Sequence, residues 1–197
     1  MTALNEGLYE DNEKVSVYDR AICFEGGPFT RETGLVRDMF GTIRAIVPRY
    51  TDMGDCTIIY AEHVYILVRR RLPDVMMSLA TELGTTPAAA AARARNVIGD
   101  VRSVPIALAP NLVLMPVHVR RARVRNDCTR AYLNVAGEFP LKLEDGADGV
   151  DAVIGHDHLP ILMPEKALER QLILTKLLMY REEASALRAL MHMPLQR

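Results

Sequence analysis

The sequence predicts an α+β domain in which an antiparallel, β-rich core carries a short helical insertion at about 74–98 and a long C-terminal helix. Short runs of β-branched and aromatic residues, each bounded by a turn signal, lie on both sides of the insertion and indicate strands. Apolar residues recur at helical spacing within the insertion and again after Pro164. The chain has 197 residues, of which 49% are hydrophobic and 25% charged, which is enough to bury a core without disulfides.

The expected strands are short. In the first half of the chain they are Val15 to Phe24, closed by Gly26-Gly27-Pro28, Thr42 to Val47, stopped by Pro48, and two strands within Cys56 to Val68 around Ala61-Glu62. In the second half they are a hairpin over Val104 to Val119 that turns at Pro110-Asn111, a second hairpin of Thr129 to Val135 and Glu138 to Leu143, and Val153-Ile154. The apolar runs of the first hairpin indicate burial on both faces. The acidic stretch Glu144 to Asp151 is expected to be a loop.

Two helices are expected in the insertion. Asp74 to Leu83 follows Pro73 and is closed by Gly84, the usual order of a first-turn proline and a terminal glycine. Thr86-Pro87 then supplies a cap and a first-turn proline for Ala88 to Ile98, which opens with five successive alanines and therefore favours helix.

The C-terminal helix is expected from Pro164 to about Met191. Between Leu172 and Tyr180 only Thr175 and Lys176 are polar, so this helix is apolar around most of its circumference. A helix of that kind is either deeply buried or contacts another subunit. The two interpretations remain open on sequence alone.

Composition and segment types bound the class of protein. No run of about 18 apolar residues occurs, so no membrane-spanning helix is expected. Residues 1–14 carry acids and no apolar stretch, which argues against a secretory signal. The three cysteines are far apart and form no CxxC pair, which favours a reducing compartment and no metal or other cofactor. We therefore expect a cytoplasmic protein.

The charge is distributed unevenly. The segment from His63 to Arg130 has eleven arginines, no lysine and four acids, which makes it +7. Because the whole chain is −1, the remainder is −8. A near-neutral protein with one strongly basic segment is suited to meet a polyanion locally, and guanidinium groups are favoured in a narrow minor groove. A solvated arginine-rich face with no ligand is the simpler interpretation.

The densest part of this segment is Arg120 to Arg125. If it is extended, Arg121, Arg123 and Arg125 point to one side, as in an arm that follows a phosphate backbone or enters a minor groove. Other arginines are candidates for the same surface, and with these the predicted DNA-binding set is Arg70, Arg93, Arg95, Arg102, Arg120, Arg121, Arg123, Arg125 and Arg130. Arg93 and Arg95 lie about 200° apart on a helix, so only one of them is expected to reach DNA. The charges at Arg69-Arg70-Arg71 can equally protect a strand edge.

His156-Asp157-His158 is the one spacing that suits metal ligands or a general base. No further His or Cys lies near it in sequence, and a solvated polar turn before Leu159-Pro160 explains the segment more simply. No glycine-rich phosphate loop or nucleophile motif occurs. We therefore expect no catalytic residue, no metal site and no enzyme, and a metal-dependent enzyme using His156 and His158 is the weakest alternative.

One succession of segments is similar to a known family. It runs Pro105-Ile106-Ala107-Leu108, Asn111 to Pro116, Arg120 to Asn126, Cys128 and Tyr132-Leu133-Asn134, with Gly84-Thr85-Thr86 upstream and Leu159 to Leu178 as a closing helix. In this order the segments resemble the ComK-type competence transcription factors, over roughly Asp55 to Tyr180. The chain departs from the family pattern in three places: the Gly-Arg step is Ala-Arg, no tryptophan follows the cysteine, and the histidine-bearing strand reads Leu133-Asn134-Val135.

The resemblance implies a DNA-binding activator of DNA-uptake genes that binds A/T-rich promoter boxes through the minor groove. It further implies a homo-oligomer, either a dimer or a dimer of dimers, and an adaptor that delivers the protein to a Clp protease. On this interpretation residues 51–197 form the DNA-binding domain, and residues 1–50 are an N-terminal extension or the first strands of the fold. The alternative is a non-enzymatic interaction or small-ligand module whose arginines bind an acidic partner or an anionic ligand.

Overall fold

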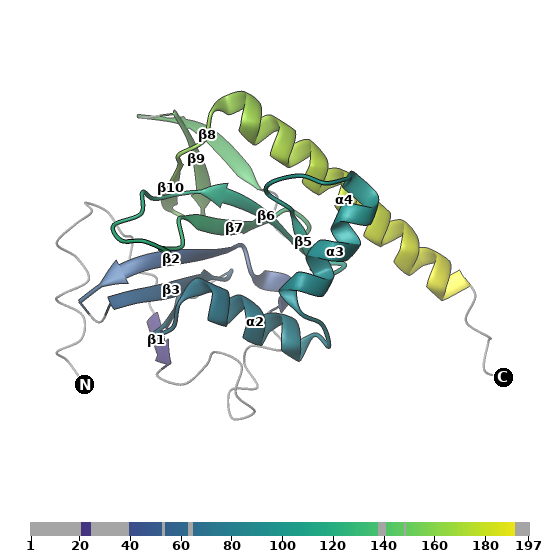
Figure 1. Cartoon of the computed structure of the whole chain (residues 1–197), viewed down its shortest axis with the longest axis horizontal. Helices are drawn as coiled ribbons and strands as arrows, with labels where there is room; N and C mark the ends of the chain where they lie inside the picture. The colour runs from purple at the N-terminus through teal and green to yellow at the C-terminus, as the bar shows by residue number, and fades with distance from the viewer. Residues whose placement is uncertain are drawn as a thin grey trace.

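The computed structural model describes residues 21–24, 40–52, 54–62, 65–137, 141–147 and 149–191. Before the insertion the elements are β1 (Ala21–Phe24), the 3-10 helix η2 (Phe40–Thr42), β2 (Ala45–Thr51), β3 (Gly54–Tyr60) and β4 (Tyr65–Val68). The insertion contains α2 (Leu72–Glu82) and α3 (Pro87–Ile98). There follow β5 (Ile106–Ala109), β6 (Leu112–His118), β7 (Arg130–Asn134), β8 (Lys142–Gly146), β9 (Gly149–Ile154), β10 (Asp157–Ile161) and α4 (Glu165–Met191). The α+β class, the helical insertion and the long C-terminal helix are as predicted (Figure 1).

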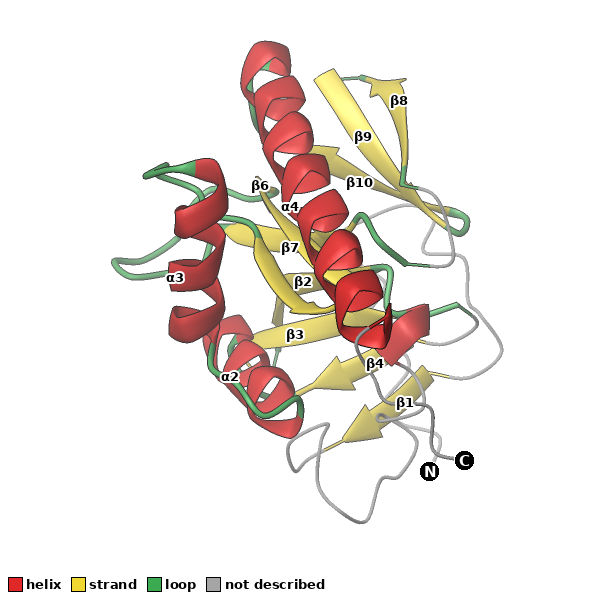
Figure 2. Ribbon diagram, turned by 90° about the vertical axis from the view of Figure 1, so that its right-hand side faces the viewer, coloured by secondary structure: helices red, strands yellow, loops and turns green. Residues whose placement is uncertain are grey.

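The described strands form two sheets. The larger has seven strands in the order β1-β4-β3-β2-β7-β6-β5, and the smaller has three in the order β10-β9-β8. Every pair is antiparallel except β1 with β4. In Figure 2, α2 and α3 lie on one side of the larger sheet, and the smaller sheet lies on the other. Both β1 and β2 belong to the larger sheet, and the 3-10 helix η2 lies between them in the chain.

Alternating side chains divide the large sheet into two apolar faces. On one face Ile46, Ile59 and Leu114 pack with the buried side of α2 and with Ala90 of α3. On the other face Val47, Met115 and other residues pack with Ala152, Ile154 and Leu168 of the small sheet and α4. The strand β6 is buried on both sides from Leu112 to Val117, as its continuous apolar run predicted.

Local signals explain the helix bounds. The Thr86 side chain accepts a hydrogen bond from the Ala89 N–H at 3.1 Å, so it caps α3 as expected. Gly84, just beyond α2, has a φ of +70°, a conformation that costs glycine nothing. The start of α3 and the end of α2 are therefore specified by signals within the insertion itself.

Three expectations about strands are wrong. Pro48 does not end a strand but lies within β2. Because β2 pairs with β7 only through Ala45 and Ile46, Pro48 is paired only with β3, and its missing N–H costs no hydrogen bond to β7. The expected hairpin after Thr129 does not form, because β7 pairs with β6 and β2 whereas β8 joins the small sheet. The acidic stretch 144–151 is no loop, since it forms parts of β8 and β9. Residues 15–20 and 138–140 lie outside the described part of the chain.

Candidate nucleic-acid interface

The connection between β6 and β7 is a structured turn rather than the extended arm expected from sequence. We call residues 120–127 the arginine loop. The Asp127 carboxylate accepts hydrogen bonds from the N–H groups of Arg123 and Val124, at 2.7 and 2.9 Å. The chain reverses at Asn126, which has a φ of +71°, a conformation that asparagine tolerates better than most residues. The expected alternation of Arg121, Arg123 and Arg125 on one side of a strand is therefore wrong.

Tyr50, at the end of β2, anchors this turn. Its hydroxyl donates a hydrogen bond to Asp127, and the guanidinium carbons of Arg120 and Arg123 lie 3.9 and 4.3 Å from the centre of its ring. These are cation–π distances. The hydrogen bond from Tyr50, followed by the backbone N–H of Val124, lowers the pKa of Asp127. The carboxylate that holds the turn is therefore ionised at neutral pH.

Arg120 lies at the base of the loop, and its side chain is held by contacts within the fold. Its Nη2 lies 2.7 Å from Asp55 Oδ1, and each side chain is only 12% exposed. Its Nε donates to the carbonyl oxygen of Cys128 at 2.7 Å. A buried, hydrogen-bonded ion pair is strongly destabilising to break. Arg120, one of the predicted DNA-binding residues, is thus a link between β3 and the loop.

The tip of the loop is different. Arg121, Arg123 and Arg125 are all exposed, and within the part of the chain that the structure describes none of them forms an ion pair. Val124 lies between two of them with 63% of its surface exposed. The tip therefore presents three exposed guanidinium groups around one apolar side chain, on a backbone held by Asp127.

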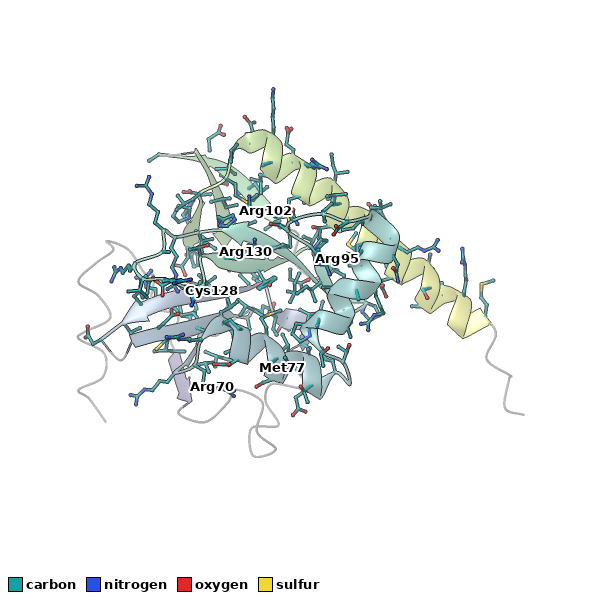
Figure 3. All side chains as sticks on the ribbon, in the orientation of Figure 1. Arg70, Met77, Arg95, Arg102, Cys128 and Arg130 are labelled. Carbon is teal, nitrogen blue, oxygen red and sulfur yellow. The ribbon has the colours of Figure 1, made fainter. Side chains whose placement is uncertain are left out.

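A second cationic group lies beside the loop. His118 and Arg130 are paired across β6 and β7, at the strand ends that the arginine loop joins. The pKa of His118 is lowered by burial and then by the nearby charges of Arg130 and Arg102. In Figure 3, Arg102 and Arg130 lie near each other, with Cys128 below them and to their left. We call Arg102, His118 and Arg130 the cationic cluster, and the cluster together with the loop tip the basic surface.

The remaining predicted residues are more dispersed. Arg93 donates to Thr85 Oγ1 at 3.2 Å, and Arg95 lies 3.4 Å from Asp100, so both have partners in the insertion or just after it. Arg70 donates to Ser78 of α2 at 3.2 Å and lies below the cluster in Figure 3. The structure therefore brings Arg102, Arg121, Arg123, Arg125 and Arg130 towards one region and leaves Arg70, Arg93 and Arg95 outside it.

Sequence reasoning missed four residues of this region: Tyr50, Asp55, His118 and Asp127. The adjacent residues Asn126 and Asp127 are of the types that favour turns, so the sequence does contain a local signal for this turn. Tyr50 and Asp55 act through the pairing of β2 with β3, which places them opposite each other, and no local pattern reveals that.

The segment His156-Asp157-His158 has a structural explanation. Asp157 is buried at the start of β10 and accepts a hydrogen bond from Tyr65, whose ring is in edge contact with Tyr60. His158 faces Asp151 at 3.9 Å. Within the described residues no group of three His, Cys, Asp or Glu side chains is arranged to hold a metal ion. The expected polar turn covers only His156, since Asp157 and His158 are strand residues.

Comparisons with known proteins found no matching family model, no matching curated protein and no matching solved structure. The helices in the described part of the chain are all too short or too polar to cross a bilayer.

Proposed function

We propose that this protein is a DNA-binding transcription regulator that contacts duplex DNA through the basic surface. The observation that carries the proposal is the tip of the arginine loop, where Arg121, Arg123 and Arg125 are exposed and form no ion pair with any described residue, while the backbone beneath them is held by Asp127 and Tyr50. Most of the affinity of such a surface comes from phosphate neutralisation. A fixed backbone reduces the entropy lost when the arginines engage.

The minor groove is the proposed site of contact. It is about 6 Å wide, and A/T-rich sequences narrow it further, which attracts arginine. A slim turn suits such a groove, and an apolar side chain such as Val124 matches the apolar wedges that minor-groove proteins insert between base steps. Neither α2 nor α3 offers a cationic face for the major groove, because Arg93 and Arg95 diverge and are partnered nearby.

The likeness to ComK-type factors extends this proposal. It suggests activation of DNA-uptake genes from A/T-rich promoter boxes in the cytoplasm, by dimers or dimers of dimers, under control of a Clp protease adaptor. The free thiols of Cys56 and Cys128 suit a reducing compartment. In this proposal Arg102 and Arg130 contact phosphates beside the groove that the loop tip enters.

The experiment is a fluorescence anisotropy titration with three duplexes of equal length: A/T-rich, G/C-rich, and one with inosine–cytosine pairs in place of A·T. Inosine–cytosine keeps the minor-groove pattern of A·T and changes the major-groove face. We expect the A/T-rich and inosine duplexes to bind with similar affinity, and the G/C-rich duplex more weakly.

Equal binding of all three duplexes and of polyglutamate would instead identify a general polyanion or acidic-partner site. Loss of affinity on the inosine duplex would assign readout to the major groove. The Arg93→Ala/Arg95→Ala variant is the matched control, because it removes two exposed arginines that lie outside the basic surface.

A further inference from the structure

The helix α4 has apolar residues on two opposite sides. Its inner side includes Leu168, Thr175 and Leu178, which are at most 3% exposed; Leu178 packs with Ala94 of α3 and with Val113 of β6. Its outer side carries large apolar residues whose exposed fractions are 66% for Ile173, 49% for Leu177, 60% for Tyr180, 60% for Leu187 and 82% for Met191. The helix that looked apolar around its circumference is thus a core element on one side and exposed on the other.

The outer residues follow a coiled-coil spacing. From Ile173 the positions advance by alternating steps of four and three residues, through Leu177, Tyr180, Ala184, Leu187 and Met191. This is the seam of a heptad repeat, which packs against another helix with the same spacing. We call these six residues the α4 stripe.

The C-terminal part of α4 leaves the body of the domain. After Leu178 no residue whose exposure is described is buried. In Figure 1 the last turns run past α3 and away from the sheets. Helices shorter than about 12–15 residues are marginal in water without packing. The projecting turns gain little from the domain's own core, so a partner along the α4 stripe would stabilise them.

The charges beside the stripe indicate which partner fits. Lys176 and Glu183 flank the same edge of the stripe, one heptad apart. If two α4 helices pack antiparallel with Leu177 against Tyr180 of the partner subunit, Lys176 lies opposite Glu183 of the partner subunit, and the symmetric contact repeats the pair. In a parallel arrangement Lys176 would instead face Arg181 of the partner subunit, a repulsive contact that offsets the attraction between Glu183 and Arg188 of the partner subunit. The charges beside the stripe therefore favour the antiparallel pairing of two copies of α4.

We propose that the α4 stripe is a self-association surface through which two copies of this chain pair by an antiparallel helix contact. The contact is independent of DNA, and it leaves the basic surface of each copy free. On this proposal both interpretations of the apolar helix hold, because Leu178 packs in the core and Leu177 lies in the contact between subunits.

Adjacent leucines supply the first test. Leu177→Glu in the full chain should raise the dimer dissociation constant by about a hundredfold or more, because it places two charges in one apolar seam. The monomer should keep the wild-type melting temperature. Leu178→Glu, one residue away, should lower the melting temperature instead, because it charges the core. A wild-type chain that sediments as a monomer throughout the micromolar range, or a Leu177→Glu variant that stays dimeric, would overturn the proposal.

A charge exchange tests the orientation without altering apolar contacts. Lys176→Glu and Glu183→Lys should each weaken the dimer several-fold by placing like charges opposite each other, and the double variant should restore wild-type affinity. If Lys176→Glu strengthens the dimer, the helices pair in parallel and the antiparallel proposal fails. If none of the three variants changes the sedimentation equilibrium, the stripe does not carry the contact.

Discussion

The base and the tip of the arginine loop hold the same type of side chain in opposite circumstances. Arg120 and Arg123 both lie over the ring of Tyr50, yet Arg120 is buried against Asp55 and Arg123 is exposed with no described ion pair. At the base, the Asp55 carboxylate pairs with a guanidinium group; at the tip, the Asp127 carboxylate bonds backbone N–H groups and leaves the described guanidinium groups without an ion pair. Charge density in sequence therefore marks the region, and only tertiary pairing separates the structural arginine from the available ones.

The largest expected effect is on stability, at the base of the loop. Arg120→Ala leaves Asp55 as a buried, unpaired carboxylate and should lower the free energy of unfolding by about 3 kcal/mol. Arg121→Ala, the neighbouring control at the exposed tip, should change it by no more than about 0.5 kcal/mol. Urea unfolding midpoints measure both. Equal urea midpoints for the two variants would show that Arg120 contributes no more to stability than Arg121 does.

Removal of the turn's anchor should affect binding more than stability. Asp127→Ala takes away the acceptor for the N–H groups of Arg123 and Val124, and DNA affinity should fall by about tenfold as the tip loses its fixed geometry. A purely electrostatic surface predicts the opposite sign, because the change removes a negative charge next to arginines. Asp74→Ala, at an exposed acid on α2, is the matched control and should leave affinity nearly unchanged.

A smaller effect is expected from pH at the cationic cluster. Burial, Arg130 and Arg102 hold the pKa of His118 below 6.5 in the free protein. A phosphate beside this imidazole would favour the charged form, so binding takes up a proton and affinity should rise by about threefold as pH falls below 6.5. His118→Gln should remove that rise when affinities are measured across the same pH series. A rise of equal size in this variant would assign the effect to another group.

The lowered pKa of His118 also predicts the direction in which the free energy of unfolding changes with pH. Because its folded pKa is below the unfolded value of 6.5, the unfolded chain binds more protons as the pH falls through that region. This group therefore favours the fold above pH 6.5 and disfavours it below. Wild-type protein should lose slightly more stability than His118→Gln when the pH is lowered from 7 to the acidic side of 6.5, as measured by thermal melts in matched buffers.

The sequence correctly predicted the helices and strands that have local signals at their ends or a continuous apolar run. Thr86-Pro87 and Gly84 bound the helices of the insertion, and apolar runs located β5 and β6. It failed where pairing over a long range decides the outcome. The strand β7 lies in the middle of the large sheet, between β6 and β2, and its nearest chain neighbour β8 belongs to another sheet. No feature of residues 129–143 distinguishes that arrangement from a hairpin.

The candidate site followed the same rule. The exposure of Arg121, Arg123 and Arg125 needed no tertiary information, because three charged side chains within five residues are expected on the surface. The turn at Asn126, the pairing of Arg120 with Asp55 and the approach of Arg102 to His118 depend on strands far apart in the chain. DNA binding itself stays a prediction.

The salt dependence of duplex affinity tests the central claim most directly. If Arg121, Arg123 and Arg125 each neutralise one phosphate, the slope of log K against log salt should become shallower by about 2.7 in the triple alanine variant, roughly 0.9 per residue. The Arg93→Ala/Arg95→Ala variant should keep the wild-type slope, and both variants should keep the wild-type melting temperature. A folded triple variant with an unchanged slope would show that the arginine loop does not contact DNA.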